Sequence, residues 1–249
     1  MYAKYIKRPL DFILSLIAII ILSPLLLIVA ILVRIKLGKP VIFKQQRPGK
    51  NEKIFTLYKF RTMTDKKDEN GNLLPDEQRL TKFGKALRST SLDELPELIN
   101  ILKGDMAIVG PRPLLVRDMV FFDEEKMKRQ NVTPGLSGLA QVKGRNSINW
   151  EEKFKYDLEY VNDLSFFMDL KVIFLTIKIV IKKEGIGEEG KDFAADYGDY
   201  LLEHKIISEN EYYKKQKEAK RILEEFYGKK RVLSTKLWRR RIWNKRITK

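Results

Sequence analysis

The stretch that decides the fold is "LDFILSLIAIIILSPLLLIVAILVRIKL", residues 10–37. From Phe12 to Val33 it carries no charged side chain, which exceeds the length of about 18 apolar residues that indicates a membrane helix. A cleaved signal peptide has a shorter apolar core and a small-residue cleavage site, and neither is evident here. We therefore expect this segment to enter the lipid bilayer as a helix.

Two topologies are open for this segment. Pro24 removes one backbone donor at its middle, and the Ser23 hydroxyl is a local partner for the carbonyl that is freed. A kinked helix could cross once. Alternatively, each half of about 13 residues, roughly 20 Å, is too short to span about 30 Å and would return on the same face. Positive charge marks the cytoplasmic side, and both flanks carry it: Lys4, Lys7 and Arg8 precede the segment, and Arg34, Lys36, Lys39, Lys44, Arg47 and Lys50 follow it. The flanks favour a re-entrant helix-hairpin that turns at Ser23 and Pro24.

The composition limits the chemistry. The 249 residues include no cysteine and one histidine, His204, so a disulfide framework, a thiolate metal site and a zinc site are excluded. Any catalysis must therefore rest on carboxylates, Lys and Arg or hydroxyls, with or without a hard cation.

The basic charge is concentrated at the C-terminus. Residues 229–249, "KKRVLSTKLWRRRIWNKRITK", hold 10 Lys and Arg and no acid; the remainder has 39 basic and 33 acidic residues, so the net charge of +16 falls to +6. A nucleic-acid-binding body is therefore not indicated. Interleaved Trp238 and Trp243 suit a basic amphipathic helix on an anionic membrane, with an RNA-binding arm or a solvated tail as alternatives.

The segment after the apolar helix predicts a small β-hairpin. Residues 41–63, "VIFKQQRPGKNEKIFTLYKFRTM", give two strands around a turn at Pro48-Gly49. In the second strand Lys59 and Arg61 share one face. That face is either solvated or binds an anion. Residues 64–79 are polar and predict a surface loop.

"RSTSLDELPELIN", residues 88–100, holds the adjacent carboxylates Asp93 and Glu94 at the start of an apolar helical pattern. Ser91 and Glu94 fit a capping box, and acids in a first helical turn complement the helix dipole. From these residues alone the carboxylates are explained as a cap. Arg88 lies close enough to help bind an anion here.

Two further motifs are candidates for ligand binding. In "GPRP", residues 110–113, flanking prolines restrict the backbone around Arg112, and a fixed guanidinium suits bidentate phosphate binding; a structural turn is the alternative. "TPGLSGLAQVKGR", residues 133–145, is a glycine-rich loop that ends in Lys143 and Arg145 but matches no nucleotide-binding fingerprint.

The second half of the chain predicts helices. Residues 150–183 begin with a mixed helix and end in "SFFMDLKVIFLTIKIVIKK", whose charged interruptions and length favour an interfacial or core helix over a second crossing. After Gly190 the chain turns charged, and "ISENEYYKKQKEAKRILEEF" is typical of a solvated amphipathic helix.

Read in order, these segments resemble a small bacterial sugar transferase, a monotopic phosphoglycosyl transferase, from about residue 5 to residue 185. The resemblance rests on Ser23-Pro24 in the apolar segment, then "KFRTM" (59–63), "LDELPEL" (92–98), "VGPRPL" (109–114) and "TPGLSGLAQVKGR" (133–145). Five motifs in this order are highly specific. The chain beyond about residue 190 lies outside it.

The resemblance implies transfer of a sugar 1-phosphate from a UDP-sugar to polyprenyl (undecaprenyl) phosphate, with release of UMP, as the first membrane step of glycoconjugate assembly. It implies Mg²⁺, a catalytic Asp93–Glu94 pair and an aspartyl-phosphosugar intermediate. We expect Asp93 as nucleophile, because a carboxylate is ionised at neutral pH, and Glu94 with Asp93 at the metal. The predicted substrate-binding side chains are Lys59, Arg61, Arg88, Arg112, Gln141 and Arg145.

The expected fold is α+β and mostly helical, with an N-terminal re-entrant membrane helix-hairpin, a small β-hairpin and interfacial amphipathic helices. The expected divisions are a membrane helix (1–40), a catalytic domain (41–185), a charged helical extension (186–228) and a basic tail (229–249). The protein is expected on the cytoplasmic face of a bacterial inner membrane, with the lipid bilayer as partner and a homo-oligomer left open. Two other classes remain: a glycosyltransferase that releases UDP, and a non-catalytic membrane scaffold.

Overall fold

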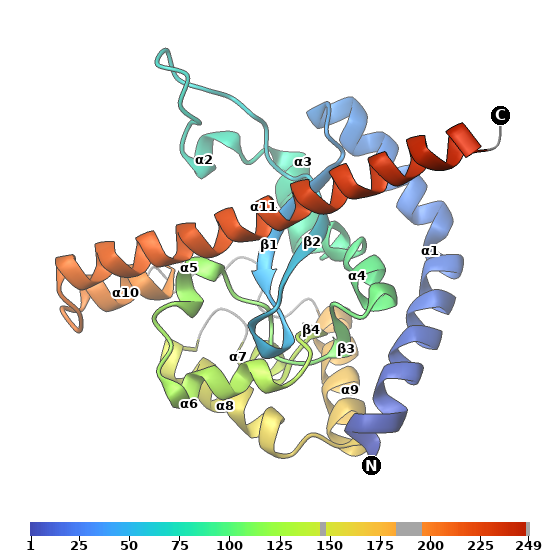
Figure 1. The fold of residues 1–249 in the computed structure, drawn as a ribbon. Coiled ribbons are helices and arrows are strands. Elements are labelled where there is room, and N and C mark those ends of the chain that lie inside the picture. Colours follow the sequence, from blue (N-terminus) through green and yellow to red (C-terminus); the bar gives the residue numbers. More distant parts are fainter. Residues whose placement is uncertain (145–147, 183–195, 248–249) are drawn as a thin grey trace. The chain divides into compact units, whose positions relative to one another are not determined.

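The structure is a computed structural model that describes residues 1–144, 148–182 and 196–247. In these ranges the chain is mostly helical, with two short two-stranded sheets (Figure 1). Two compact units are present: Met1–Pro113 with Asp123–Ala195, and Leu114–Phe122 with Asp196–Lys249. The expectation of a mostly helical α+β chain is confirmed. The four expected divisions of the chain stay predictions.

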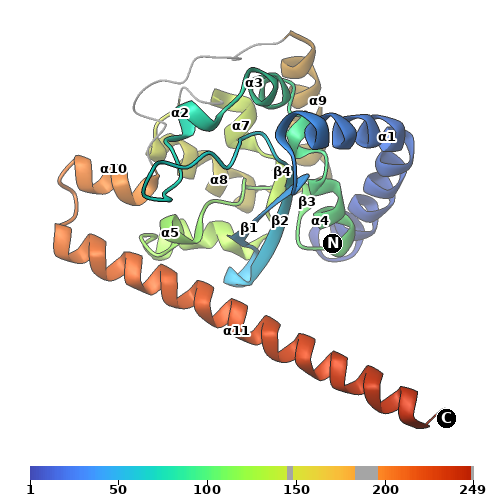
Figure 2. The same cartoon turned by 90° about the horizontal axis from the view of Figure 1, so that it is seen from above.

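The N-terminal apolar segment is one bent helix. A π-helical turn, Tyr2–Ile6, leads into α1, Lys7–Leu37, which contains Pro24, and two views show α1 bent into two legs (Figures 1 and 2). Ser23 Oγ donates a hydrogen bond to the Ile20 carbonyl at 2.8 Å. In a regular helix the amide of residue 24 would donate to the Ile20 carbonyl, but proline has no amide hydrogen. The prediction that the Ser23 hydroxyl is the local partner of this carbonyl is therefore confirmed.

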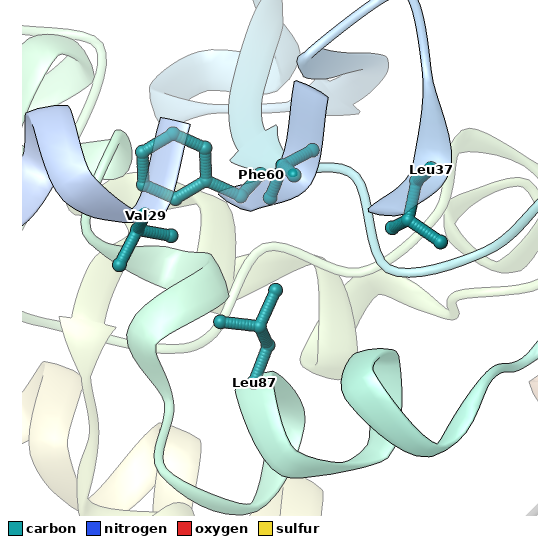
Figure 3. Close-up of a cluster of buried hydrophobic side chains, with 5 residues drawn as sticks. Val29, Leu37, Phe60 and Leu87 are labelled. Carbon is teal, nitrogen blue, oxygen red and sulfur yellow. The ribbon is translucent and has the colours of Figure 1, made fainter. Parts of the chain in front are cut away.

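Both legs of α1 pack against the first unit. The first leg places Ala18, Ile19 and Leu22 against a buried cluster made of Phe55, Leu57, Leu98, Ile101 and Met106. The second leg contributes to another cluster, which consists of Val29, Val33, Leu37, Phe60 and Leu87 (Figure 3). The bend at Pro24 lets one helix cover two separate patches of the same unit.

The opposite face of α1 is apolar and exposed. Large apolar side chains are exposed along the helix: Phe12, Ile13, Leu14, Leu16, Ile17, Ile20, Ile21, Leu27, Ile28, Ile31, Leu32 and Ile35. Within the described residues, Tyr2–Leu37 is the helix long and apolar enough to cross a membrane. Entry and return on one face stays a prediction.

The predicted β-hairpin is confirmed. Strand β1, Ile42–Pro48, pairs antiparallel with β2, Ile54–Phe60, and a 3₁₀ turn, Lys50–Glu52, joins them. Helix α4, Glu97–Lys103, is fixed to this hairpin by Asn100, which accepts from the Tyr58 amide at 3.1 Å and donates to the Thr56 carbonyl at 2.7 Å. Because Asn100 is fully buried, these bonds fix the middle of α4 beside β2.

Short helices lead from the hairpin to the acidic pair. They are α2, Asp76–Arg79, α3, Lys82–Ser89, and a 3₁₀ turn, Leu92–Glu94. Ser91 precedes the 3₁₀ turn in a left-handed conformation (φ 54°), and its side chain caps nothing there. The capping-box interpretation of Ser91 and Glu94 is therefore wrong.

A second sheet brings two motifs together. Strand β3, Ala107–Val109, runs parallel to β4, Gly135–Ser137. A Cβ on Gly135 would lie 2.0 Å from the Gly110 amide nitrogen, so only glycine permits this backbone approach. The glycines of "GPRP" and "TPGLSG" thus serve contact between the two loops.

The remaining helices complete both units. The first unit adds α6, Glu124–Met127, a 3₁₀ turn, Lys128–Asn131, and then α7, Leu139–Gly144, α8, Trp150–Asn162, and α9, Phe166–Lys182. The second contains α5, Val116–Met119, α10, Tyr197–Glu203, and α11, Glu209–Ile247. The predicted helices after Trp150 and beyond residue 208 are confirmed, whereas a membrane-surface position for any of them stays a prediction.

Candidate active site

Three segments far apart in the sequence converge on Glu94. Lys59 Nζ from β2 lies 2.7 Å from Glu94 Oε1, and Arg112 Nη2 from the loop after β3 lies 2.5 Å from the same oxygen. Both cations use Oε1, so neither engages Oε2. The hairpin, the acidic turn and the "GPRP" loop therefore meet at one carboxylate.

Glu97 is a third acid of this cluster, which residue patterns did not single out. Its Oε1 lies 3.1 Å from Lys59 Nζ, and the side chain is 2% exposed. Burial and the charge of Glu94 raise the pKa of Glu97 to about 7, against the opposing charge of Lys59. Glu97 lies three residues after Glu94, about one helical turn further on, and this spacing was the one sequence feature that could have indicated its place in the cluster.

Asp93 and Glu94 are adjacent but differ in their surroundings. Burial, then the charge of Glu94, raises the pKa of Asp93 to about 6, although Lys59, Arg88 and Arg112 oppose this. Burial alone would also raise the pKa of Glu94, but Arg112 and Lys59 outweigh it and lower that pKa to about 2. Among described residues no hydrogen bond or ion pair reaches the Asp93 carboxylate, which is buried. One carboxylate is held in place, while the other is available to react.

A cavity of about 1000 Å³ opens beside the acidic pair. Leu92 and Glu94, the neighbours of Asp93, line it together with Arg88 and Arg112. Apolar residues from β4, α7 and α9 also line it: Leu136, Ala140, Val142, Ile173, Ile177 and Val180. The cavity therefore offers a cationic region next to an apolar one.

A buried ion pair between Arg129 and Asp157 holds the backbone of the Arg112 loop. Arg129 donates to Asp157 Oδ2 from Nε at 3.0 Å and from Nη2 at 2.7 Å, and Nη2 also donates to the Arg112 carbonyl at 2.7 Å. Arg129 and Asp157 are each 2% exposed. A buried guanidinium bound on several sides has little freedom, so it anchors the backbone of Arg112. No sequence pattern indicated this pair.

The remaining predicted substrate-binding residues lie in different places. Arg88 and Gln141 line the cavity; Arg88 Nε also donates to Thr62 Oγ1 at 3.1 Å, and the buried Gln141 Oε1 has no hydrogen-bond partner among the described residues. Arg61 instead donates to the backbone carbonyls of residues 39 and 63, which ties it to the chain around the hairpin. Arg145 lies outside the described residues.

The site contains oxygen donors that suit a hard cation. Asp93 and Glu94 are adjacent, and Oε2 of Glu94 is not taken by Lys59 or Arg112. No cluster of three or more His, Cys, Asp or Glu that could hold a metal occurs among the described residues. Proteins commonly bind Mg²⁺ through one or two carboxylates plus substrate phosphates and water, so this pair fits Mg²⁺ when a diphosphate completes the shell.

Comparisons with known proteins identify the family. Residues 2–183 match the bacterial sugar transferase family. The chain is 51% identical over 181 residues to EpsL of Bacillus subtilis, an uncharacterized sugar transferase, which covers 73% of this chain and 90% of the relative. The chain therefore belongs to the bacterial sugar transferase family.

Two more distant relatives have substrates in their names. The UDP-glucose:undecaprenyl-phosphate glucose-1-phosphate transferase of Klebsiella pneumoniae is 41% identical over 184 residues, covering 69% of this chain and 39% of the relative. The UDP-N-acetylgalactosamine-undecaprenyl-phosphate N-acetylgalactosaminephosphotransferase of Aeromonas hydrophila is 36% identical over 185 residues. This match covers 71% of this chain and 44% of the relative. This chain thus spans less than half the length of these two proteins. The predicted resemblance and the prediction of a phosphoglycosyl transferase enzyme are confirmed.

Proposed function

We propose that this bacterial sugar transferase moves a sugar 1-phosphate from a UDP-sugar to a polyprenyl phosphate and releases UMP. One observation carries the proposal: the free, buried carboxylate of Asp93 lies next to Glu94, which Lys59 and Arg112 hold in place. The two relatives with named substrates transfer sugar phosphates to undecaprenyl phosphate, which supports the same reaction here.

The proposed reaction proceeds in two displacements at one phosphorus. An Asp93 oxygen attacks the phosphorus that carries the sugar, a new Asp–O–P bond forms, and the bond to UMP breaks. A phosphate oxygen of the polyprenyl phosphate then attacks the same phosphorus, and the Asp93 carboxylate leaves. The product is a polyprenyl-diphosphate sugar, and the enzyme regains its free carboxylate.

The basic residues of the site counter the negative charge of the donor. A carboxylate and a diphosphate repel each other, so approach requires cations close to the reacting oxygens. Arg112 is held by Glu94 and, through its carbonyl, by Arg129, so its guanidinium is preorganised. Arg88 lines the same cavity and suits a second phosphate contact.

Mg²⁺ is the metal proposed for this site, held by Glu94 and Asp93 together with donor phosphate oxygens. When bound, it would neutralise charge on the diphosphate and stabilise the leaving phosphate. Glu94 is suited to this role because its low pKa keeps it ionised throughout the physiological range. Lys59 and Arg112 orient the carboxylate by taking its other oxygen.

The membrane arrangement follows from the lipid acceptor. A re-entrant α1 would lie at headgroup depth on the cytoplasmic face of a bacterial inner membrane, with its exposed apolar face in lipid. Both legs of α1 pack on the same unit, which supports entry and return on one side. Helix α9 also exposes Phe167, Leu170 and Phe174, a spacing typical of an interfacial helix.

The test is a screen for UMP release. The purified full chain is incubated with polyprenyl phosphate, Mg²⁺ and each of a panel of UDP-sugars, and the released nucleotide is identified by chromatography. We expect UMP with at least one donor. Release of UDP would instead identify a glycosyltransferase that breaks the sugar–oxygen bond, and no turnover with any donor would favour a scaffold.

Matched variants connect activity to the site. Arg112→Lys should lower kcat/KM about a hundredfold, because a point charge cannot replace a fixed guanidinium. Arg79→Lys is the control, since Arg79 pairs with the exposed Asp76 on α2 at 3.2 Å, and it should keep near-normal activity. Equal effects of the two substitutions would remove Arg112 from the site.

A further inference from the structure

The chain beyond residue 183 lies outside the matched family region, yet its described part is built onto the family region. The second compact unit combines residues 196–249 with the short segment 114–122. That segment directly follows Arg112 and Pro113 in the chain. The question is what this extension does for the loop that carries Arg112.

An ion-pair network joins the two parts of the second unit. Arg117 of α5 lies 3.0 Å from Asp196 and 2.7 Å from Asp199. Asp199 also accepts a hydrogen bond from the Tyr212 hydroxyl of α11 at 2.5 Å. One arginine in the family region thus engages both helices of the extension.

A buried carboxylate makes a second connection. Asp118 is 2% exposed and accepts from the Leu115 amide at 3.1 Å and from the Tyr197 amide at 2.9 Å, each through a different oxygen. One bond closes the first turn of α5, and the other reaches the start of α10. Without the backbone amide of Tyr197, this buried carboxylate oxygen would have no hydrogen-bond donor, which is costly.

Aromatic packing completes the interface. The Phe121 and Tyr212 rings stack at 5.9 Å. Gly198 faces the same ring: a Cβ there would lie 2.4 Å from Phe121 Cε2. The position therefore requires glycine for close contact, which distinguishes a specifically built interface from a loosely attached tail.

We propose that the C-terminal extension positions the Arg112 loop, by holding the segment 114–122 that continues from it. The inference rests on the catalytic role proposed for Arg112. Helix α5 has four residues, and a helix this short is not stable alone. Its contacts with α10 and α11 supply the missing stability, and they restrict the backbone that leaves Pro113. Arg117, Asp118 and Gly198 act through Arg112 as positioning residues.

Two glycine substitutions form a matched test. Gly198→Ala places a methyl group against Phe121, whereas Gly228→Ala, on α11, meets nothing within 4 Å. We expect Gly198→Ala to lower kcat/KM for the UDP-sugar about tenfold, while Gly228→Ala leaves it unchanged. In an Arg112→Lys background Gly198→Ala should add no further loss, because the residue through which it acts is already changed.

Hydrogen exchange supplies a readout that does not depend on activity. The Gly110 amide donates to the Ser137 carbonyl at 2.9 Å, and the Gly135 amide donates to the Pro111 carbonyl at 3.0 Å, so both report on the Arg112 loop. Both should exchange about tenfold faster in Gly198→Ala than in Gly228→Ala. Faster exchange confined to 114–122 and the extension would overturn the proposal, as would additive losses with Arg112→Lys. If wild-type protein releases no UMP, the proposed function fails, and the exchange experiment still decides whether the extension controls the loop.

Discussion

At the residue scale, Asp93 and Glu94 are neighbours whose pKa values are shifted in opposite directions. Asp93 is destabilised as an anion by burial and by Glu94, while Glu94 is stabilised as an anion by Arg112 and Lys59. A nucleophile benefits from a raised pKa because a more basic oxygen is a better attacking group. A carboxylate that binds a metal ion or pairs with cations, as proposed for Glu94, benefits from staying ionised. The environments thus divide the work between two chemically similar side chains.

The first prediction concerns pH. With a pKa of about 6, Asp93 is largely ionised at pH 7 and largely protonated at pH 5, so the rate of the first half-reaction should fall about tenfold per pH unit below 6. Single-turnover release of UMP without lipid acceptor measures this step and avoids the acceptor phosphate, which itself titrates near pH 6.

Glu97 supplies the control for that measurement, because its pKa of about 7 lies in the same range. The acid limb should persist in Glu97→Gln. A limb that disappears in this variant would move the titrating group to Glu97, and a flat profile down to pH 5 would contradict the raised pKa of Asp93.

The second prediction is that the two carboxylates affect stability with opposite signs at pH 8 in metal-free buffer. The pKa of Asp93 is raised on folding, so its stabilisation exists below pH 4 and is lost as pH rises through about 6; Asp93→Asn should therefore raise the free energy of unfolding by about 2–3 kcal/mol. The pKa of Glu94 is lowered, so its stabilisation exists above about 4.5 and is lost as pH falls towards 2; Glu94→Gln should cost about 2–3 kcal/mol.

Unfolding midpoints of both variants in one detergent measure this contrast. We expect a higher midpoint than wild type for Asp93→Asn and a lower one for Glu94→Gln, with activity lost in both. Midpoints shifted in the same direction would contradict the opposite pKa shifts assigned to Asp93 and Glu94.

At the element scale, α1 depends on the pair at its bend. Pro24 has no amide hydrogen to donate to the Ile20 carbonyl, and Ser23 Oγ donates to it at 2.8 Å instead, so this carbonyl keeps the hydrogen bond that a helix in lipid requires. A straight helix of 31 residues would be roughly 46 Å long and could span a bilayer. The bend is what allows the two legs to reach both apolar clusters.

The third prediction follows from this bend. Replacing Ser23-Pro24 with Ala-Leu restores the missing donor, so α1 should straighten, shift towards a crossing topology and lose activity. Because the chain has no cysteine, single cysteines at the exposed Lys4 and Lys50 report sidedness. In intact cells an impermeant thiol reagent should label neither position of the wild type, and should label position 4 in the Ala-Leu variant.

Ser23→Ala alone is the control, since it keeps Pro24 and with it the bend. External labelling at position 4 of the otherwise wild-type chain would establish a single crossing and end the re-entrant interpretation.

The fourth prediction concerns α9. Phe174 is 67% exposed on this helix, and Leu73, in the polar loop before α2, is 52% exposed. A spin label at Phe174→Cys in vesicles should be reached better by oxygen than by an aqueous nickel complex, because oxygen concentrates in lipid, and the label at Leu73→Cys should show the reverse. Equal behaviour at the two sites would place α9 away from the bilayer.

At the scale of the whole molecule, local patterns predicted the parts that depend on neighbouring residues. The apolar run, the hairpin at Pro48-Gly49 and the helices after Trp150 follow from periodicity and turn residues, and all are confirmed. Patterns misled at Ser91, whose spacing to Glu94 fits a cap. Lys59 and Arg112 outcompete the backbone for that carboxylate, and such tertiary contacts leave no local signature.

The long-range contacts that hold the site together could not be predicted either, because contacts between residues far apart in the sequence leave no local pattern. Arg129 meets Asp157 and the Arg112 carbonyl across 28 and 17 residues, and no spacing rule links such positions. The alternating pattern predicted that Arg61 shares a strand face with Lys59, but β2 ends at Phe60, and Arg61 donates instead to backbone carbonyls nearby. Residue type and order indicated the chemistry, whereas the partners of each charge emerged only in three dimensions.

The most direct test of the proposed chemistry is to trap the enzyme between its two displacements. The full chain is mixed with a UDP-sugar that supports turnover, without polyprenyl phosphate, then quenched, digested and mapped by mass spectrometry. We predict a sugar-phosphate adduct on Asp93, formed together with one equivalent of UMP, and its loss when polyprenyl phosphate is added. An adduct on a different residue, or turnover with no adduct on the chain, would contradict Asp93 as the nucleophile.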